Sequence, residues 1–139
     1  MREYRLPLFF AFFVFCLAGL PVQGKAQDGQ DIHIAKDQFL DENRSRTIPY
    51  KVYTPQNISS PLPVIIFSHG LGGSVEAAPY LGAALARHDY IAFHIQHPGS
   101  DEGIWKGKKP REAMSNFQKA LKDGKAARDR YNDVPFVIN

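Results

Sequence analysis

The stretch FSHGLGGS, Phe67–Ser74, decides how the fold is read, because it follows directly on the apolar run Leu62–Phe67. That run is rich in β-branched and aromatic residues and is typical of a strand buried on both faces. Three glycines then let the backbone bend sharply at the end of the strand. A turn of this kind has three possible roles: it binds a ligand, it positions a catalytic group, or it only reverses the chain.

The residues after the turn predict a helix and a second buried strand. Tyr80–His88 has helical spacing, and the helix begins either at Ser74, a good N-cap, or near Pro79, a good first helical residue. Tyr90–Gln96 is again apolar and strand-like. Strand, turn, helix and strand together predict a βαβ unit within a parallel sheet.

The residues before the run predict an antiparallel hairpin. Asp31–Leu40 alternates partly, Arg46–Pro55 alternates better, and Asp41–Asn43 forms the turn between them. The fold class predicted is therefore α/β, with an antiparallel hairpin followed by the βαβ unit of a mainly parallel sheet.

The C-terminal third predicts a long loop and one clear helix. The loop covers 97–109, and Pro110 begins a helix with Met114, Phe117 and Leu121 on one face. We expect Gly124 to weaken or end that helix.

Residues 1–26 read as a secretory signal. Arg2 and Arg5 precede the uncharged run Leu6–Leu20, and Gly24-Lys25-Ala26 offers small residues before a cleavage point. A membrane anchor is the alternative, but the run is short for a span. We expect a secreted or periplasmic protein with no stable membrane span after cleavage. Cys16, the only cysteine, lies in this segment, so the mature chain would hold no disulfide.

Charge argues against nucleic acid as a partner. The segment 1–26 holds Arg2, Arg5 and Lys25 against Glu3, so the remainder carries 14 basic and 13 acidic residues. With a net charge of +1, residues 27–139 carry no excess of basic residues of the kind that binds the phosphate backbone of nucleic acid.

Nucleotide-binding patterns fail at the turn. Glycines at 70, 72 and 73 do not complete G-x-G-x-x-G, because Val75 stands at the last position, and no Gly-Lys-Ser/Thr follows. Two readings remain open on the residues alone. One is a plain tight turn; the other is an oxyanion turn, whose N–H would stabilise developing negative charge by about 2.7–4 kcal/mol.

Metal and elbow patterns are also missing. His94 and His97 are three apart on a strand, which puts them on opposite faces, and no third ligand is spaced to complete a site. No serine stands in a G-x-S-x-G elbow. No cofactor or metal is predicted.

Three segments in order, RTIPYKVYTP (46–55), PLPVIIFSHGLGGS (61–74) and YLGAALARHDYIAFHIQHPGSDEGIW (80–105), resemble a known family. They are similar to the N-terminal half of secreted α/β-hydrolases, nearest to the esterases like dienelactone hydrolase, chlorophyllase and platelet-activating-factor acetylhydrolase. The resemblance covers residues 45–139. Asp89 departs from it, since Gly is usual there, but Asp tolerates the left-handed C-cap that the position requires.

The resemblance implies that this chain does not contain the family's catalytic triad of Ser, Asp and His. In this family the nucleophile Ser, the Asp and the His all follow the point that corresponds to residue 139, so residues 27–139 look like the N-terminal part of a domain truncated before the elbow. Val134–Asn139 looks like the start of the helix before the nucleophile strand.

Site residues also follow from the resemblance. The oxyanion donor would be the N–H of Leu71 in the turn Gly70-Leu71-Gly72, and His69 would orient that turn. The substrate pocket would be bordered by His97, Ser100 and Trp105.

Two functions are therefore expected as alternatives. In its full-length form the protein would be an exported serine-type carboxylic ester hydrolase, esterase- or lipase-like, acting on a small-molecule or lipid ester. Otherwise it would be a truncated non-catalytic remnant or an exported binding domain.

Overall fold

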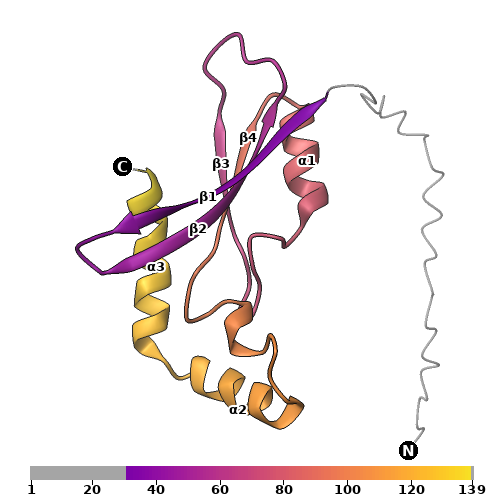
Figure 1. Ribbon diagram of the computed structural model, residues 1–139. Coiled ribbons are helices and arrows are strands. Elements are labelled where there is room, and N and C mark those ends of the chain that lie inside the picture. The colour runs from indigo at the N-terminus through magenta and orange to yellow at the C-terminus, as the bar shows by residue number, and fades with distance from the viewer. Residues whose placement is uncertain (1–30, 139) are drawn as a thin grey trace, which may run out of the picture.

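The computed structural model describes residues 31–138 (Figure 1), so the predicted signal segment 1–26 with Cys16 lies outside the described residues. One sheet runs in the order β1-β2-β4-β3. Its strands are β1 (Ile32–Asp41), β2 (Arg46–Pro55), β3 (Val64–Ser68) and β4 (Ile91–Ile95). The helices are α1 (Pro79–Arg87), the 3₁₀ turn η1 (Glu102–Ile104), α2 (Pro110–Ala120) and α3 (Gly124–Ile138).

The sheet confirms the predicted α/β class. β1 and β2 form the antiparallel hairpin, in register from Ile32 opposite Pro55 to Asp41 opposite Arg46. β3, α1 and β4 form the βαβ unit, and β3 pairs with β4 in parallel. Because β2 also pairs with β4 in antiparallel fashion, the described part of the sheet is more antiparallel than the mainly parallel sheet expected.

Helix α1 covers one face of the sheet. It begins at Pro79, the later of the two predicted starts, because Ala78 before it takes a left-handed conformation with φ of 51°. Past its other end, Asp89 has a φ of 61°, which confirms the left-handed position predicted there. Gly82 lies directly against the ring of Tyr53, so this helix and β2 approach closely.

Helix α3 differs from the prediction. Gly124 does not weaken the preceding helix: α2 has already ended at Ala120, and Gly124 begins a new helix of 15 residues. Its start is fixed by Asp123, whose Oδ1 accepts hydrogen bonds from the N–H groups of Lys125 and Ala126 at 2.9 and 3.0 Å. Val134–Ile138 is accordingly the last part of a helix and not the start of one.

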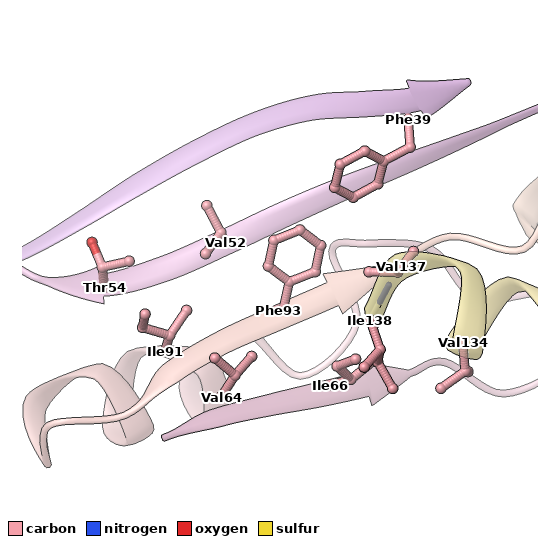
Figure 2. A pocket seen from close by; sticks show the side chains of 10 residues that line it. All are labelled: Phe39, Val52, Thr54, Val64, Ile66, Ile91, Phe93, Val134, Val137 and Ile138. Atoms are coloured by element: carbon pink, nitrogen blue, oxygen red, sulfur yellow. The ribbon is translucent and has the colours of Figure 1, made fainter. Parts of the chain in front are cut away.

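The sheet face opposite α1 is only partly covered, by the C-terminal turns of α3. Between them lies an apolar hollow of about 750 Å³ (Figure 2). Its lining residues are Phe39, Val52, Thr54, Val64, Ile66, Ile91, Phe93, Val134, Val137 and Ile138. Strand residues two apart share this face, so Val64, Ile66 and Ser68 of β3 all lie on the α3 side. No helix within residues 31–138 combines the length and the apolar character needed to cross a membrane.

The contact between α1 and β2 predicts a matched pair of variants. In Gly82→Ala the new Cβ would lie 2.5 Å from the Tyr53 ring, so overpacking of about 1–3 kcal/mol should outweigh the roughly 1 kcal/mol gained in helix propensity. Gly124→Ala meets no atom within 4 Å and should be neutral or stabilising. Urea denaturation of both variants tests this; equal stabilisation by the two substitutions would contradict the packing described.

Candidate active site

The turn after β3 is a tight reversal stabilised by glycine. The N–H of Gly73 donates to the Gly70 carbonyl at 3.0 Å, and Gly72 has a φ of 77°. A positive φ at the third of four residues is the form of a type II turn, which favours glycine there. A Cβ on residue 72 would also lie 2.9 Å from the ring of Phe117. Both constraints require Gly72 to be glycine.

The loop after β4 holds this turn in place. The Gly72 N–H donates to the Ser100 carbonyl at 2.8 Å, and the Glu102 N–H donates to the Gly73 carbonyl at 2.8 Å. The indole N–H of Trp105 donates to the Gly72 carbonyl at 2.6 Å. Turn and loop are therefore joined by three hydrogen bonds.

Leu71 occupies the second position of the turn. An N–H at that position has no acceptor within a type II turn, and no hydrogen-bond acceptor for it lies among residues 31–138. Leu71 is 38% exposed. The N–H that the resemblance assigns to an oxyanion is thus free of protein partners in the part of the chain described.

His69 connects the turn to the end of β4. Its Nδ1 lies 2.7 Å from the Gly70 carbonyl, and its Nε2 accepts the His97 backbone N–H at 3.1 Å. Accepting at Nε2 and donating at Nδ1 is the pattern of a neutral imidazole. Burial lowers the pKa of His69, which also favours the neutral ring. These contacts suit a residue that orients the turn.

The three predicted pocket residues lie at different depths. His97 is fully buried, and Ser100 is buried with its hydroxyl donating to the His97 carbonyl at 3.2 Å. Trp105 is 43% exposed beside the turn. Ser100 and Trp105 are hydrogen-bonded to Gly72, and His97 is hydrogen-bonded to Ser100 and His69; of the three, only Trp105 is open to a ligand without rearrangement. Contact of these residues with substrate stays a prediction.

His94 and His97 face opposite sides of the sheet. His94 lies between the rings of Tyr53 and Phe67, with centroids 5.0 and 4.5 Å away, on the side of α1. His97 lies on the side of α3, where its Nδ1 is 2.9 Å from the carboxylate of Asp133. Within residues 31–138, no three His, Cys, Asp or Glu side chains come together as metal ligands.

Sequence reasoning missed Asp133, a fully buried carboxylate in α3. Arg46 donates to both of its oxygens, at 2.8 and 2.9 Å, and Arg44 donates to Oδ1 at 2.9 Å. His97 is the third partner. Burial alone would raise the pKa of Asp133, but the hydrogen bonds from His97, Arg46 and Arg44 outweigh it and hold the pKa well below the ordinary value.

Ser68, the last residue of β3, was also missed. Its Oγ lies 2.6 Å from Nε2 of His97, so Ser68, His97 and Asp133 form one continuous hydrogen-bonded series. Arg130 of α3 donates to the same Oγ at 3.2 Å. The G-x-S-x-G elbow was the sequence pattern used to look for a nucleophilic serine. Ser68 does not match it, because Ile66 stands where the first glycine is required.

The buried carboxylate predicts a dependence of stability on pH. Because the folded pKa of Asp133 is lowered, its contribution is complete above the unfolded pKa of about 3.9 and is lost as pH falls below it. Asp133→Asn should therefore lower the free energy of unfolding by about 3–5 kcal/mol at neutral pH. The difference from wild type should shrink as the pH falls from about 4 toward 2.

Urea denaturation across this pH range measures the effect. Asp37→Asn, at an exposed carboxylate of β1, is the control and should change the free energy by less than about 0.5 kcal/mol. A difference between wild type and Asp133→Asn that stays constant down to about pH 2 would contradict the lowered pKa.

Two solved structures are similar to this chain. One is a cold-adapted esterase from an Arctic intertidal metagenomic library, with 16% identity and a TM-score of 0.47, over 80% of this chain and 48% of that one. The other is S-formylglutathione hydrolase from Staphylococcus aureus, with 12% identity and a TM-score of 0.45, over 78% of this chain and 43% of that one. No family model and no curated protein matches the chain. The chain spans less than half the length of either solved structure.

Proposed function

We propose that this chain is the N-terminal part of an exported serine-type carboxylic ester hydrolase, in which the N–H of Leu71 stabilises the oxyanion. One observation carries the proposal: a rigid turn at the carboxyl end of β3 presents an N–H without a protein acceptor among the described residues. The order and spacing of the motifs in residues 46–105 support the same family of enzymes.

The turn has the property that an oxyanion donor needs. When a nucleophile attacks an ester carbonyl, negative charge develops on the carbonyl oxygen, and a donor fixed in advance stabilises it without reorganising. Hydrogen bonds from Gly72 to the Ser100 carbonyl and from Trp105 to the Gly72 carbonyl fix this turn. Leu71 is therefore held ready, whatever group supplies the nucleophile.

The free edge of β3 suits the strand that would carry the proposed elbow serine. β3 is the outer strand in the order β1-β2-β4-β3, so its far edge is unpaired within residues 31–138. A further parallel strand at this edge would end at the same side of the sheet as the turn. A serine elbow following that strand would then stand beside the Leu71 N–H, with the Asp and His supplied later in the chain.

The substrate class proposed is a small-molecule or lipid ester. The exposed face of Trp105 beside the turn gives an apolar surface for an acyl or alcohol group. The mechanism calls on no metal or cofactor, because a serine, an imidazole and an oxyanion donor suffice for ester hydrolysis.

A second candidate is a non-catalytic product, either a truncated remnant or an exported binding domain. It is favoured by the open apolar hollow against the sheet, a feature that a binding domain would use directly. Residues 27–139 expressed alone discriminate the two. A monomer with a cooperative thermal transition supports a binding domain, whereas aggregation supports a hydrolase domain deprived of its remaining strands.

The hydrolase proposal is tested first by the reading frame after codon 139. We expect G-x-S-x-G within the next few dozen residues. Its absence there would contradict the proposal. In the longer protein, Leu71→Pro removes the N–H and should lower kcat about 10²–10³-fold, with little change in KM. Leu71→Ala keeps the N–H and is the control; equal losses in kcat for both variants would exclude the oxyanion role.

Export is tested by the mature N-terminus. We expect a signal peptidase to cleave after Ala26, so the protein recovered outside the cytoplasm should begin at Gln27. Intact mass and N-terminal sequencing measure this. Recovery in the membrane fraction with residues 1–26 still attached would favour the anchor instead.

A further inference from the structure

We propose that Ser68 is a nucleophile in its own right, activated by His97 and positioned by Asp133, and that it attacks esters of apolar carboxylic acids. This site lies within the described residues. It depends neither on the oxyanion role proposed for Leu71 nor on any serine beyond residue 139.

The hydrogen-bonding roles of the three side chains are mutually consistent. Asp133 has no proton to give, so it accepts from Nδ1–H of His97 at 2.9 Å. In the neutral tautomer that donates at Nδ1, Nε2 is an acceptor, and the Ser68 hydroxyl, whose Oγ lies 2.6 Å away, is placed to donate to it. Arg130 donates to the same Oγ at 3.2 Å, so the hydroxyl proton points away from the guanidinium and toward the imidazole. A nucleophile paired with a base that a third group orients is the arrangement of an activated serine.

The proposed base, His97, and the positioning residue, Asp133, are firmly held, because both side chains are fully buried. The Asp133 carboxylate is fixed by Arg44 and Arg46, and the backbone N–H of His97 donates to His69. The imidazole therefore does not need to reorient before it accepts the Ser68 proton, which is the preorganisation that general-base catalysis requires.

The charged side chains around the site favour the loss of the proton from Ser68 but disfavour its gain by His97. The guanidinium of Arg130 next to Oγ stabilises an alkoxide. Arg44 and Arg46 offset the charge of Asp133, which weakens its support for the imidazolium that forms on His97. Acylation should consequently be slower than at a triad whose carboxylate has no cationic partners, and a covalent probe is a better readout than turnover.

The nucleophile is accessible from a hollow of its own. Ser68 is exposed at the end of β3 and borders a space of about 540 Å³ along α3. Apart from Ser68, this space is lined by Ala127, Arg130, Tyr131, Val134, Pro135 and Ile138. Aliphatic and ring carbons dominate this lining, which suits an apolar acyl group. Arg130, which donates to the Oγ atoms of Ser68 and Ser100, lines the same space.

The reaction is acyl transfer with water as the second reactant. Ser68 Oγ attacks the ester carbonyl carbon while its proton passes to Nε2 of His97. The bond to the alcohol oxygen then breaks, and His97 returns the proton to the leaving alcohol. Water, deprotonated by His97, attacks the acyl-serine, releasing the carboxylic acid and restoring the Ser68 hydroxyl.

The test is covalent labelling of the full 139-residue chain with an alkyl fluorophosphonate, from which the serine oxygen displaces fluoride. We expect one adduct by intact mass, and peptide mapping should place it on Ser68. Concentrated urea should abolish labelling, because the activation requires the folded hydrogen bonds. Ser68→Ala should lose the adduct, while Ser115→Ala, at an exposed serine of α2, should keep it.

The variants of the other two residues separate activation from folding. His97→Gln should slow labelling about 10²-fold or more. Asp133→Asn should slow labelling per folded molecule, as counted by circular dichroism, whereas a purely structural role would leave that rate unchanged. Absence of any adduct on the wild-type chain, an adduct elsewhere, or labelling that persists in urea would overturn the proposal.

The same probe keeps this proposal distinct from the hydrolase assignment. In a longer protein with an elbow, a label on the elbow serine supports the proposed function, and a label on Ser68 supports the present inference. Each label is read by peptide mapping, so either proposal can fail while the other stands.

Discussion

The described chain depends on one buried charge, the carboxylate of Asp133. A carboxylate without exposure to water costs several kcal/mol unless it is fully paired, and here three side chains from the hairpin and the loop after β4 pair it. Helix α3 has few other close backbone approaches to the sheet. The ionic hydrogen bonds to Asp133, together with the edge contact of Phe136 with Phe39, therefore hold this helix against the sheet.

The two faces of the sheet differ in where buried charge lies. On the α1 side, close packing dominates: Gly82 admits the Tyr53 ring, and His94 stands among aromatic rings and is kept neutral by burial, which lowers its pKa. On the α3 side, the buried ion pairs of Asp133 lie beside the stacked rings of Phe39, Tyr50 and Phe93, and the apolar hollow is left open next to them. The chemistry of the molecule gathers on this second face because Ser68 and His97 both point toward it.

Local sequence patterns predicted most of the helices and strands. They could not predict which side chains distant in the sequence pair with one another. Arg46–Pro55 was recognisable by alternation, and Pro79 was one of the two helix starts that the sequence offered, whereas the left-handed position of Asp89 was expected from the family resemblance. The start of α3 was misread because a glycine ends helices more often than it begins them, and the Asp123 side chain reverses that preference.

The candidate site shows the same division. A tight turn was predictable from three glycines close together, whereas the series from Ser68 to Asp133 joins residues 29 and 36 positions apart in the sequence. Only the fold brings those side chains together, and no spacing rule in a single sequence encodes them.

The pairing of the two loops at the carboxyl end of the sheet has a consequence for how the sequence can change. Gly73 and Asp101 form a parallel bridge, flanked by the hydrogen bonds from the Gly72 N–H to the Ser100 carbonyl and from the Glu102 N–H to the Gly73 carbonyl. Gly72 must stay glycine and the Trp105 side chain contributes one hydrogen bond, but the hydrogen bonds on either side of the bridge are made by backbone groups. An insertion or deletion in one loop would shift its register against the other, so the length of both segments, more than their composition, is what the architecture restricts.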